Sequence, residues 1–202
     1  MSATIATAAA RIPADKSRPR RPANPPRRRE RALIRAAQGG SADALEELFR
    51  SHWPRAHRAA YLIVHDAATA EDIAQEAFLS AIRALDRFDR RRPFGPWLTR
   101  IVVNRAIDWQ RARALRAEVA VPDGAGNSEM PPEHGGPYSS ELMAALAALP
   151  AEQRAMVVLR HLLEYTPGEI GELLLLPRGT VNSRLRRGLD RLAASLSAEE
   201  KR

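Results

Sequence analysis

The sequence predicts an all-α protein with two small helical domains joined by a flexible linker. Apolar residues recur at three- and four-residue intervals, and the helix formers Ala, Leu, Arg and Glu dominate the 202-residue chain. No segment alternates apolar and polar residues as a half-buried strand does. Residues 117–139 are rich in Gly, Pro and acidic residues, a composition typical of a linker. The two domains are therefore placed at 30–116 and 140–197, with a short tail at 198–202.

The N-terminal residues 1–29 are predicted to be a disordered basic arm. Residues 1–31 contain five prolines, no aromatic residue and a net charge of +7, so they cannot bury enough apolar surface to offset chain entropy. The whole chain has a net charge of +8, which leaves only +1 for residues 32–202. Within that remainder, 87–116 is basic and 117–150 is acidic, which indicates surfaces with different electrostatic roles.

In the first domain, Gly39 and Gly40 are predicted to end one helix and Ser41 to cap the next. Pro54 is expected to start or kink the continuation of this second helix, which runs to Val64. The first turns of the second helix present one apolar face, formed by Leu45, Leu48 and Phe49.

The sequence from Thr69 to Asp72 resembles a capping box, which predicts a helix that ends near Leu85. At 100° per residue, one broad face of this helix is apolar and the opposite face is charged around Leu79. The apolar face consists of Ala74, Ala77, Phe78, Ala81, Ile82 and Leu85. The charged face consists of Asp72, Gln75, Glu76, Arg83 and Asp86. The residues alone allow a solvated face or a docking surface, because an exposed Leu ringed by charges suits a protein partner with basic groups.

Residues 93–96 are expected to form a turn before the last helix of this domain, from Trp97 to about Arg116. The basic segment interleaves arginines with four aromatic residues: Phe88, Phe94, Trp97 and Trp109. One polar stripe of the helix carries Arg100, Asn104, Asp108 and Arg111. Cations for phosphates and rings for stacking suit single-stranded nucleic acid. The alternative is that Phe94 and Trp97 fill the core, and it is favoured for Trp97.

The second domain is expected to open near Ser140, break near Pro150 and resume through Arg160. The sequence from Thr166 to Glu169 supplies a cap, a proline at the first helical position and Glu at the third, which predicts another helix. After a break at 175–177, the last helix carries an apolar stripe, formed by Val181, Leu185, Leu189 and Leu192. Its other side carries Thr180, Ser183, Arg186 and Arg187. We interpret the pair as a helix-turn-helix, because a plain helical hairpin would lack the clustered arginines.

Several classes of function are excluded or disfavoured. The absence of cysteine excludes disulfides, thiolate metal sites and Cys nucleophiles. Among the histidines, only His52 and His57 approach a metal spacing, and i, i+5 places them off a shared face. No apolar run reaches the roughly 18 residues of a membrane span. The acidic residues of 72–86 project outward, whereas a hydrolase needs converging carboxylates. We therefore expect a soluble protein that has no catalytic residues, no metal and no cofactor.

Three motifs carry a family resemblance: TAEDIAQEAFLSAIRALDRF, PFGPWLTRIVVNRAID and LPAEQRAMVVLRHLLEYTPGEIGELLLLPRGTVNSRLRRGLDRL. In this order they resemble regions 2 and 4 of bacterial sigma-70 factors, and the two-domain layout resembles the extracytoplasmic-function (ECF) group. The resemblance covers about residues 30–116 and 140–197. It implies a cytoplasmic promoter-specificity subunit of RNA polymerase, associated with the nucleoid when in the holoenzyme, that directs transcription initiation.

The resemblance assigns a partner to each surface. The acidic helix would dock on the clamp helices of the largest subunit of core RNA polymerase through Asp72, Gln75, Glu76, Leu79 and Arg83. The next loop and helix would melt the minus-ten element of promoter DNA and capture an unstacked base, through Phe88, Arg90, Arg91, Arg92, Arg100, Asn104 and Arg111. The helix-turn-helix would read the minus-thirty-five element as duplex DNA through Arg178, Thr180, Asn182, Ser183, Arg184, Arg186 and Arg187. Regulation by an anti-sigma factor is common in this group, and the sequence leaves that partner open.

Three residues depart from the family pattern. Leu175 lies in a turn that usually contains a residue tolerant of positive φ, so a strained turn is expected. Gly171 replaces the preferred Ala and is expected to weaken its helix by roughly 1 kcal/mol. Asn182 stands where Lys or Arg is frequent, and a bidentate Asn would favour adenine over guanine.

Other functions explain less of the chain. A stand-alone helix-turn-helix transcriptional regulator is the principal alternative, and it accounts for residues 140–197 but not for the acidic helix or the aromatic basic segment. A protein-only adaptor leaves the arginines of the last helix unexplained.

Overall fold

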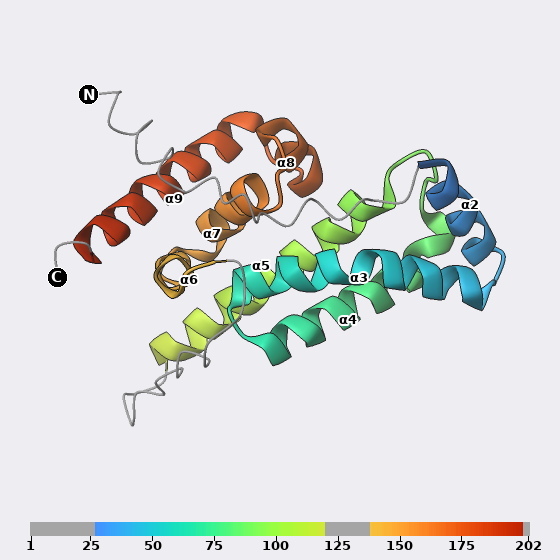
Figure 1. Ribbon diagram of the computed structural model, residues 1–202, viewed down its shortest axis with the longest axis horizontal. Coiled ribbons are helices and arrows are strands. Elements are labelled where there is room, and N and C mark those ends of the chain that lie inside the picture. The colour runs from blue at the N-terminus through green and yellow to red at the C-terminus, as the bar shows by residue number, and fades with distance from the viewer. Residues whose placement is uncertain (1–26, 120–137, 200–202) are drawn as a thin grey trace.

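The computed structural model of this protein describes residues 27–119 and 138–199. Within these ranges the chain is helical and contains no strand, which confirms the all-α prediction (Figure 1). The predicted basic arm up to residue 26 and the linker residues 120–137 lie outside the described residues. No helix of the described part is long and apolar enough to cross a membrane.

The first domain is built by four helices: α2 (Arg27–Gln38), α3 (Ala42–Val64), α4 (Ala67–Ala84) and α5 (Phe94–Val119). A short 3-10 turn, Leu85–Arg87, follows α4. Helices α3, α4 and α5 lie side by side, and the short α2 packs at one end of them (Figure 1). Buried side chains from all four helices, among them Ile34, Leu48, Phe78 and Val102, form a common core.

Polar side chains cap the N-terminal turns of α3 and α4. Ser41 Oγ accepts a hydrogen bond from Ala44 N at 3.3 Å, which confirms the predicted cap of α3. The predicted cap at Thr69 is wrong. Asp66 caps α4, because its extended backbone brings the carboxylate within 2.7 Å of Thr69 N, and the helix starts earlier. Hydrogen bonds from Thr69 hold the pKa of Asp66 below its usual value.

Other helix boundaries in the first domain also differ from those predicted. Helix α2 begins at Arg27, so the last residues assigned to the arm are helical. Helix α3 runs through Pro54 as one continuous helix. Helix α5 begins at Phe94 rather than Trp97, because Pro96 falls in a first turn whose N–H groups have no acceptor within the helix. The C-terminal end of α5 reaches into the segment predicted as linker.

The second domain consists of α6 (Ser140–Ala147), α7 (Ala151–Val157), α8 (Pro167–Leu174) and α9 (Arg178–Glu199). A π-helical segment, Val158–Leu162, continues α7. The predicted capping box of α8 is confirmed: Glu169 N donates to Thr166 Oγ1 at 3.3 Å, and Thr166 N donates to Glu169 Oε2 at 2.8 Å. Helices α8 and α9 form the predicted helix-turn-helix.

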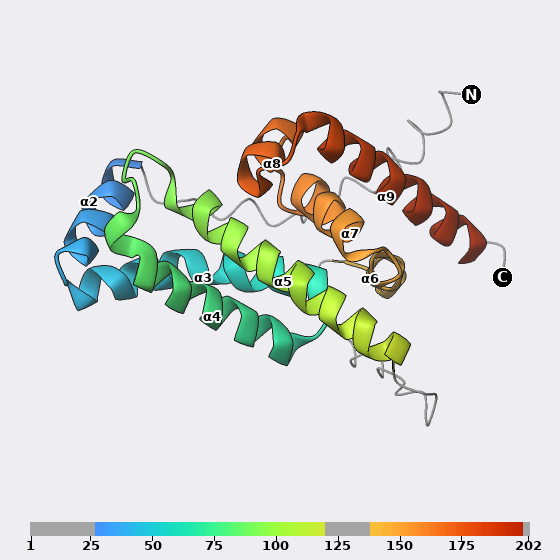
Figure 2. The same cartoon turned by 180° about the vertical axis from the view of Figure 1, so that it is seen from behind.

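The two domains pack against each other. Helix α5 contacts α7 and α8, and α3 contacts α6 and α7 (Figure 2). One cluster of buried side chains continues from Ile34 in α2 to Leu185 in α9. Hydrogen bonds also cross the boundary, because Tyr165 Oη donates to Thr99 Oγ1 at 3.3 Å and Arg55 donates to the Leu163 carbonyl at 3.3 Å. The described parts of the two domains therefore share one core.

Candidate functional site

The outer face of α4 presents the residues predicted to dock on a partner. All are exposed, and they are Asp72, Gln75, Glu76, Leu79 and Arg83. Leu79 is 53% exposed, and two further apolar side chains are exposed: Ile82, one turn along α4, at 44%, and Phe49 of α3 at 41%. The Phe49 ring contacts Phe78, the residue before Leu79, with centroids 4.8 Å apart. The prediction that Ile82 faces the core is wrong, because it follows Leu79 by three residues and shares that side of the helix. We call Phe49, Leu79 and Ile82 the apolar patch.

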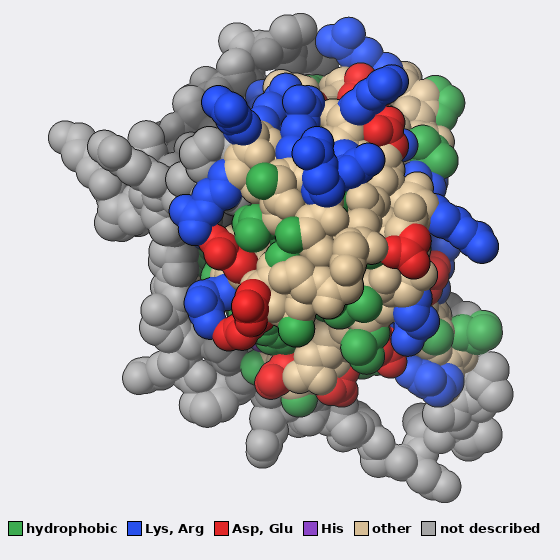
Figure 3. Space-filling model, turned by 90° about the vertical axis from the view of Figure 1, so that its right-hand side faces the viewer, with side chains coloured by type: hydrophobic (Ala, Val, Ile, Leu, Met, Phe, Trp, Pro, Cys, Tyr) green, Lys and Arg blue, Asp and Glu red, His purple; other side chains and the backbone are tan. Residues whose placement is uncertain are grey.

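The end of the molecule near α2 separates side chains by charge. In Figure 3 most basic side chains gather in the upper half of this end, whereas most acidic side chains and many hydrophobic ones lie in the lower half. Exposed arginines of α2 and of the loop after α4 contribute the basic character: Arg27, Arg28, Arg31, Arg35, Arg90, Arg91 and Arg92. One end of the first domain therefore offers two surfaces of different character.

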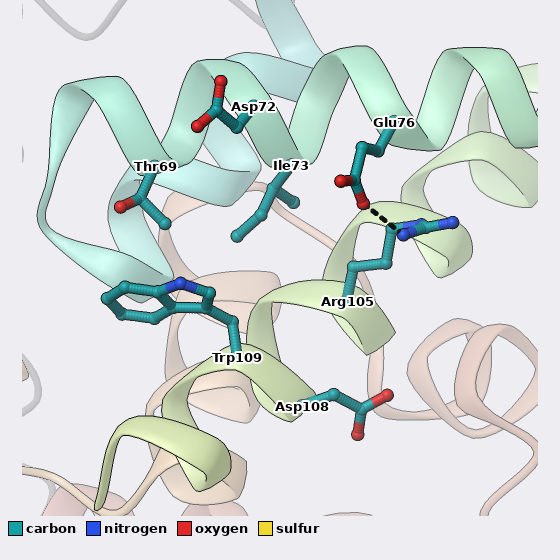
Figure 4. Close-up of a pocket in the computed structure, with 7 residues that line it drawn as sticks. All are labelled: Thr69, Asp72, Ile73, Glu76, Arg105, Asp108 and Trp109. Carbon is teal, nitrogen blue, oxygen red and sulfur yellow. Dashed lines mark hydrogen bonds and ion pairs between the residues drawn. The ribbon is translucent and has the colours of Figure 1, made fainter. Parts of the chain in front are cut away.

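A hollow lies between α4 and α5, and it is lined by Thr69, Asp72, Ile73, Glu76, Arg105, Asp108 and Trp109 (Figure 4). Arg105 reaches across this hollow, with Nη1 2.5 Å from Glu76 Oε2 and Nη2 2.7 Å from Ser80 Oγ. Sequence reasoning missed this pair because the two residues lie on different helices. A basic group that binds Glu76 from outside must compete with Arg105.

The residues predicted to bind single-stranded nucleic acid divide into accessible and buried ones. The exposed or half-buried side chains are Arg90, Arg91, Arg92, Arg100, Asn104 and Arg111. Phe88 is only 8% exposed, and its ring centroid lies 4.5 Å from that of Trp97 and 5.8 Å from that of Phe94. Because these two rings cover Phe88, its ring is not available for stacking on a base in this arrangement. Phe94 is 3% exposed and belongs to the core, which confirms the alternative interpretation that it fills the core and does not stack on a base.

Arg111 is engaged with the second domain. Its Nε and Nη2 donate to Glu152 Oε1 at 2.9 and 2.5 Å, and its Nη1 lies 3.5 Å from Asp108. The hydrogen bond from Arg111 lowers the pKa of Glu152, and the charge of Arg184 in α9 adds to the effect. Glu152 thus lies among arginines from both predicted DNA-binding surfaces. No sequence pattern indicates this role, because an acidic residue on a short amphipathic helix is ordinarily solvated.

The turn between α8 and α9 has the strained backbone that was expected. Leu175 adopts the left-handed conformation with φ 55° and ψ 43°, and its side chain is 66% exposed. Gly171 lies opposite this turn: the Leu176 N–H donates to the Gly171 carbonyl at 2.9 Å, and a Cβ on Gly171 would lie 2.9 Å from the Leu176 carbonyl oxygen. The expectation that Gly171 merely weakens its helix is therefore incomplete, because the close approach of the turn requires a residue without Cβ.

Gly171→Ala is expected to lower the free energy of unfolding by about 1–3 kcal/mol, because the added methyl group overlaps a backbone oxygen that cannot rotate away. The same change in an open helix stabilises it by about 1 kcal/mol. Gly179→Ala, in the first turn of α9, is the matched control, since its Cβ would meet nothing within 4 Å. Thermal unfolding measures both variants. A Gly171→Ala protein as stable as Gly179→Ala would mean that the turn adjusts without cost.

The outward side of α9 carries the residues predicted to read duplex DNA. Arg178, Asn182, Ser183, Arg186 and Arg187 are exposed, and Thr180 and Arg184 are half-buried. The opposite side packs inward, with Val181 fully buried and Leu185 and Leu192 below 10% exposure. Arg187 Nε donates to the Ser183 carbonyl at 3.3 Å, which draws this side chain along the helix. The polar and apolar faces of α9 therefore separate as predicted.

Residues 27–119 and 138–199 contain no group of three or more His, Asp or Glu side chains that could hold a metal ion. His52 is 2% exposed, and its Nε2 lies 3.2 Å from Glu30 Oε1 of α2, without hydrogen-bond geometry between them.

Comparison with known sequences matches both domains to one family. Residues 48–116 match Sigma-70 region 2, and residues 139–192 match Sigma-70, region 4. The ECF RNA polymerase sigma factor SigW of Bacillus subtilis is 32% identical over 176 residues, which cover 81% of this chain and 94% of SigW. The RNA polymerase sigma factor CarQ of Myxococcus xanthus is 34% identical over 167 residues, which cover 80% of this chain and 94% of CarQ.

Solved structures with the same fold are similar over most of the chain. CnrH in complex with the cytosolic domain of CnrY is 26% identical, with a TM-score of 0.62 over 84% of this chain and 97% of CnrH. The sigma factor RpoE in complex with the anti-sigma factor NepR from Bartonella quintana has a TM-score of 0.60 at 22% identity, over 75% of this chain and 96% of that one. The latter likeness concerns the fold alone.

Proposed function

Because this chain belongs to the sigma-70 family of RNA polymerase sigma factors, in its ECF group, and so directs promoter-specific transcription initiation, we propose that three of its surfaces divide this work. The observation that carries the proposal is their occurrence on one chain: an acidic docking face with an apolar patch, a basic loop, and an arginine-rich helix-turn-helix. A stand-alone regulator would need only the last of these.

The outer face of α4 docks on the clamp helices of the largest polymerase subunit. In support, the exposed Asp72, Gln75 and Glu76 precede Leu79 on the same helix, so polar side chains border the apolar patch on that side. Such an arrangement fits a partner helix that carries apolar and basic side chains. Arg83 and the competing Arg105 would tune the contact, since both carry the same charge as the basic groups of the partner.

The loop after α4 and the outer face of α5 hold the melted minus-ten strand. Support comes from the exposed Arg90, Arg91 and Arg92, which can neutralise phosphates, and from the exposed Asn104, which can hydrogen-bond a base edge. Capture of an unstacked base offsets part of the few kcal/mol that unstacking costs. Phe88 acts in this scheme as a buried support beneath the loop.

Helix α9 enters the major groove of the minus-thirty-five element. Its N-terminal half offers Arg178, Asn182 and Ser183 toward base edges, while Arg186 and Arg187 can meet phosphates. Asn182 is suited to adenine, because its amide can make two hydrogen bonds to that base.

A phosphate near Arg111 would have to replace Glu152, so promoter binding requires the two domains to separate.

Further partners and the absence of catalysis belong to the same proposal. CnrH and RpoE were solved with CnrY and NepR, respectively, and NepR is described as an anti-sigma factor. We propose that a protein of this kind also binds this chain and restrains it. The chain has no catalytic task of its own and acts in the cytoplasm, where the polymerase and its promoters are.

Run-off transcription tests the proposed function. The full-length chain, added to core polymerase lacking any sigma factor, is expected to start transcripts at defined sites on a library of fragments from its own genome. Core polymerase alone and the chain alone are the controls. A stand-alone regulator would give no transcripts here and would change transcription only with another sigma factor present. Absence of specific transcripts, with inhibitory partners removed, would overturn the proposed function.

A further inference from the structure

Helix α2 holds both ends of the loop between α4 and α5, although it precedes the matched region 2 segment at residues 48–116. At its C-terminal end, Gln38 Nε2 donates to the carbonyl oxygens of Leu85 and Phe88, at 2.8 and 3.1 Å. Near its N-terminal end, Glu30 Oε2 accepts a hydrogen bond from Phe94 N at 3.5 Å. We call these contacts the α2 brace.

The Gln38 contact fixes the start of the loop. A primary amide has two N–H donors, and the half-buried amide of Gln38 directs both toward backbone carbonyls on either side of the 3-10 turn. The same turn is closed by the hydrogen bond from Phe88 N to the Leu85 carbonyl, at 2.9 Å. Without the amide, the Phe88 carbonyl would have to find water or move, and the loop would leave its present path.

The Glu30 contact fixes the end of the loop. Glu30 is 3% exposed, and its Oε2 accepts the Phe94 N–H. Its Oε1 lies 3.2 Å from His52 Nε2 of α3 without hydrogen-bond geometry, so α3 confines the carboxylate by close packing. The N–H groups at the start of α5 have no acceptor within the helix, and the positive end of the helix dipole favours a carboxylate there. The His52 ring also packs on Phe94, with centroids 5.0 Å apart. Phe94, which covers Phe88, is thereby fixed in place.

We propose that Gln38 and Glu30 are positioning residues for base selection: they set the path of the loop that carries Arg90, Arg91 and Arg92, and so decide which base it accepts. The inference rests on the proposed function, namely capture of a minus-ten base by this loop together with the outer face of α5. Base selection requires side chains held to within about 0.5 Å, and a loop fixed at both ends meets that demand better than a free one. Specificity for the minus-ten base therefore depends on a helix that does not itself contact the base.

The test uses full-length chain with core polymerase on duplex promoters in which the minus-ten segment is randomised, with the transcripts sequenced. Gln38→Glu keeps the size of the side chain but replaces two donors by a carboxylate that faces two carbonyl oxygens. We expect the preference at the captured position to fall by about tenfold or more, because the supporting shell no longer fixes the loop. Gln38→Met, which has no charge and no donor, should shift the profile in the same direction.

Gln110→Glu is the matched control. Gln110 is also half-buried, and its Nε2 donates to the carbonyl oxygens of Ile63 and Val64, at 3.1 and 3.2 Å, at the other end of α3. Its loss should cost comparable stability and leave the base preference unchanged. A loss of preference in Gln110→Glu equal to that in the Gln38 variants would overturn the inference, since the effect would then be general destabilisation.

The remaining outcomes separate the inference from the proposed function. If the wild-type chain prefers certain bases and both Gln38 variants keep the same profile, the α2 brace has no positioning role. If the wild-type chain transcribes without any base preference in the randomised segment, base capture itself fails and the inference with it. If Gln38→Glu fails to fold, the base preference of Gln38→Met tests the inference instead, and thermal unfolding shows whether that variant is folded. Flattened preference at one position, with unchanged affinity for core polymerase, supports the inference.

Discussion

Replacing Arg154 with alanine is expected to lower the free energy of unfolding by about 3–5 kcal/mol and to separate the two domains. Arg154 is 6% exposed, and its guanidinium donates to three backbone carbonyls: Ile63 at 2.5 Å, Ala147 at 2.5 Å and Leu149 at 2.9 Å. Ile63 belongs to the last turn of α3, and Ala147 ends α6. The free carbonyls at helix C-termini need donors, and the negative end of the helix dipole favours a cation.

The charge of Arg154 supports this expected loss of stability. Burial, and to a lesser extent the charge of Arg113, lowers the pKa of Arg154 to about 10, so the side chain stays protonated near neutral pH. Burial first, and then the charge of Arg154, lowers the pKa of His65 to about 4, so this histidine stays neutral. In Arg154→Ala the pKa of His65 should rise toward 6.5, because both causes weaken.

Denaturant unfolding and small-angle X-ray scattering measure the effects of Arg154→Ala on stability and on domain separation, and an NMR titration follows His65. Arg116→Ala, an exposed arginine in the last turn of α5, is the control and should change stability by less than about 0.5 kcal/mol. Unchanged stability in Arg154→Ala would mean that water replaces the guanidinium at the carbonyls. Lower stability with unchanged dimensions would mean that other contacts hold the domains together.

Local features of the fold could be predicted from the sequence because their causes lie within a few residues. The capping box at Thr166 depends on a residue three positions away, and the exposure of Leu79 follows from helix geometry alone. The same geometry gave the wrong result for Ile82. A helical wheel gives the direction of a side chain, but it does not say how much of that side the neighbouring helices cover. The start of α4 was missed because Thr69 and Asp66 are both acceptable caps and only the backbone decides.

The packing of the two domains could not be predicted, because its partners are distant and carry no sequence signal. Arg154 donates to the backbone carbonyl of Ile63. Because every residue has a backbone carbonyl, the identity of residue 63 gives no sign of this contact. Glu152 carries no sequence signal of its own, and its role depends on Arg111, which lies in the other domain. The α2 brace was hidden for the same reason, since Gln38 acts on Leu85 and Phe88 through their backbones.

Leu79→Asp is expected to weaken binding to core polymerase by roughly 30-fold to 1,000-fold, which corresponds to about 2–4 kcal/mol for a central interface residue. The side chain is 53% exposed and is the most exposed member of the apolar patch, so the isolated domain gains little from it. In the complex, a carboxylate at this point must lose its water without an arranged partner. When the chain is limiting, the yield of run-off transcripts should fall in proportion to the loss of affinity for core polymerase.

Leu115→Asp is the matched control for Leu79→Asp, since Leu115 of α5 is 61% exposed and lies outside the docking face. Both variants place Asp on an exposed helix position, so they should lose similar, small amounts of thermal stability. Fluorescence anisotropy with labelled chain measures the affinity for core polymerase. If Leu79→Asp unfolds at a clearly lower temperature than Leu115→Asp, Leu79 supports the fold instead of the docking surface. If both bind core polymerase as tightly as the wild type, the outer face of α4 is not where the polymerase docks.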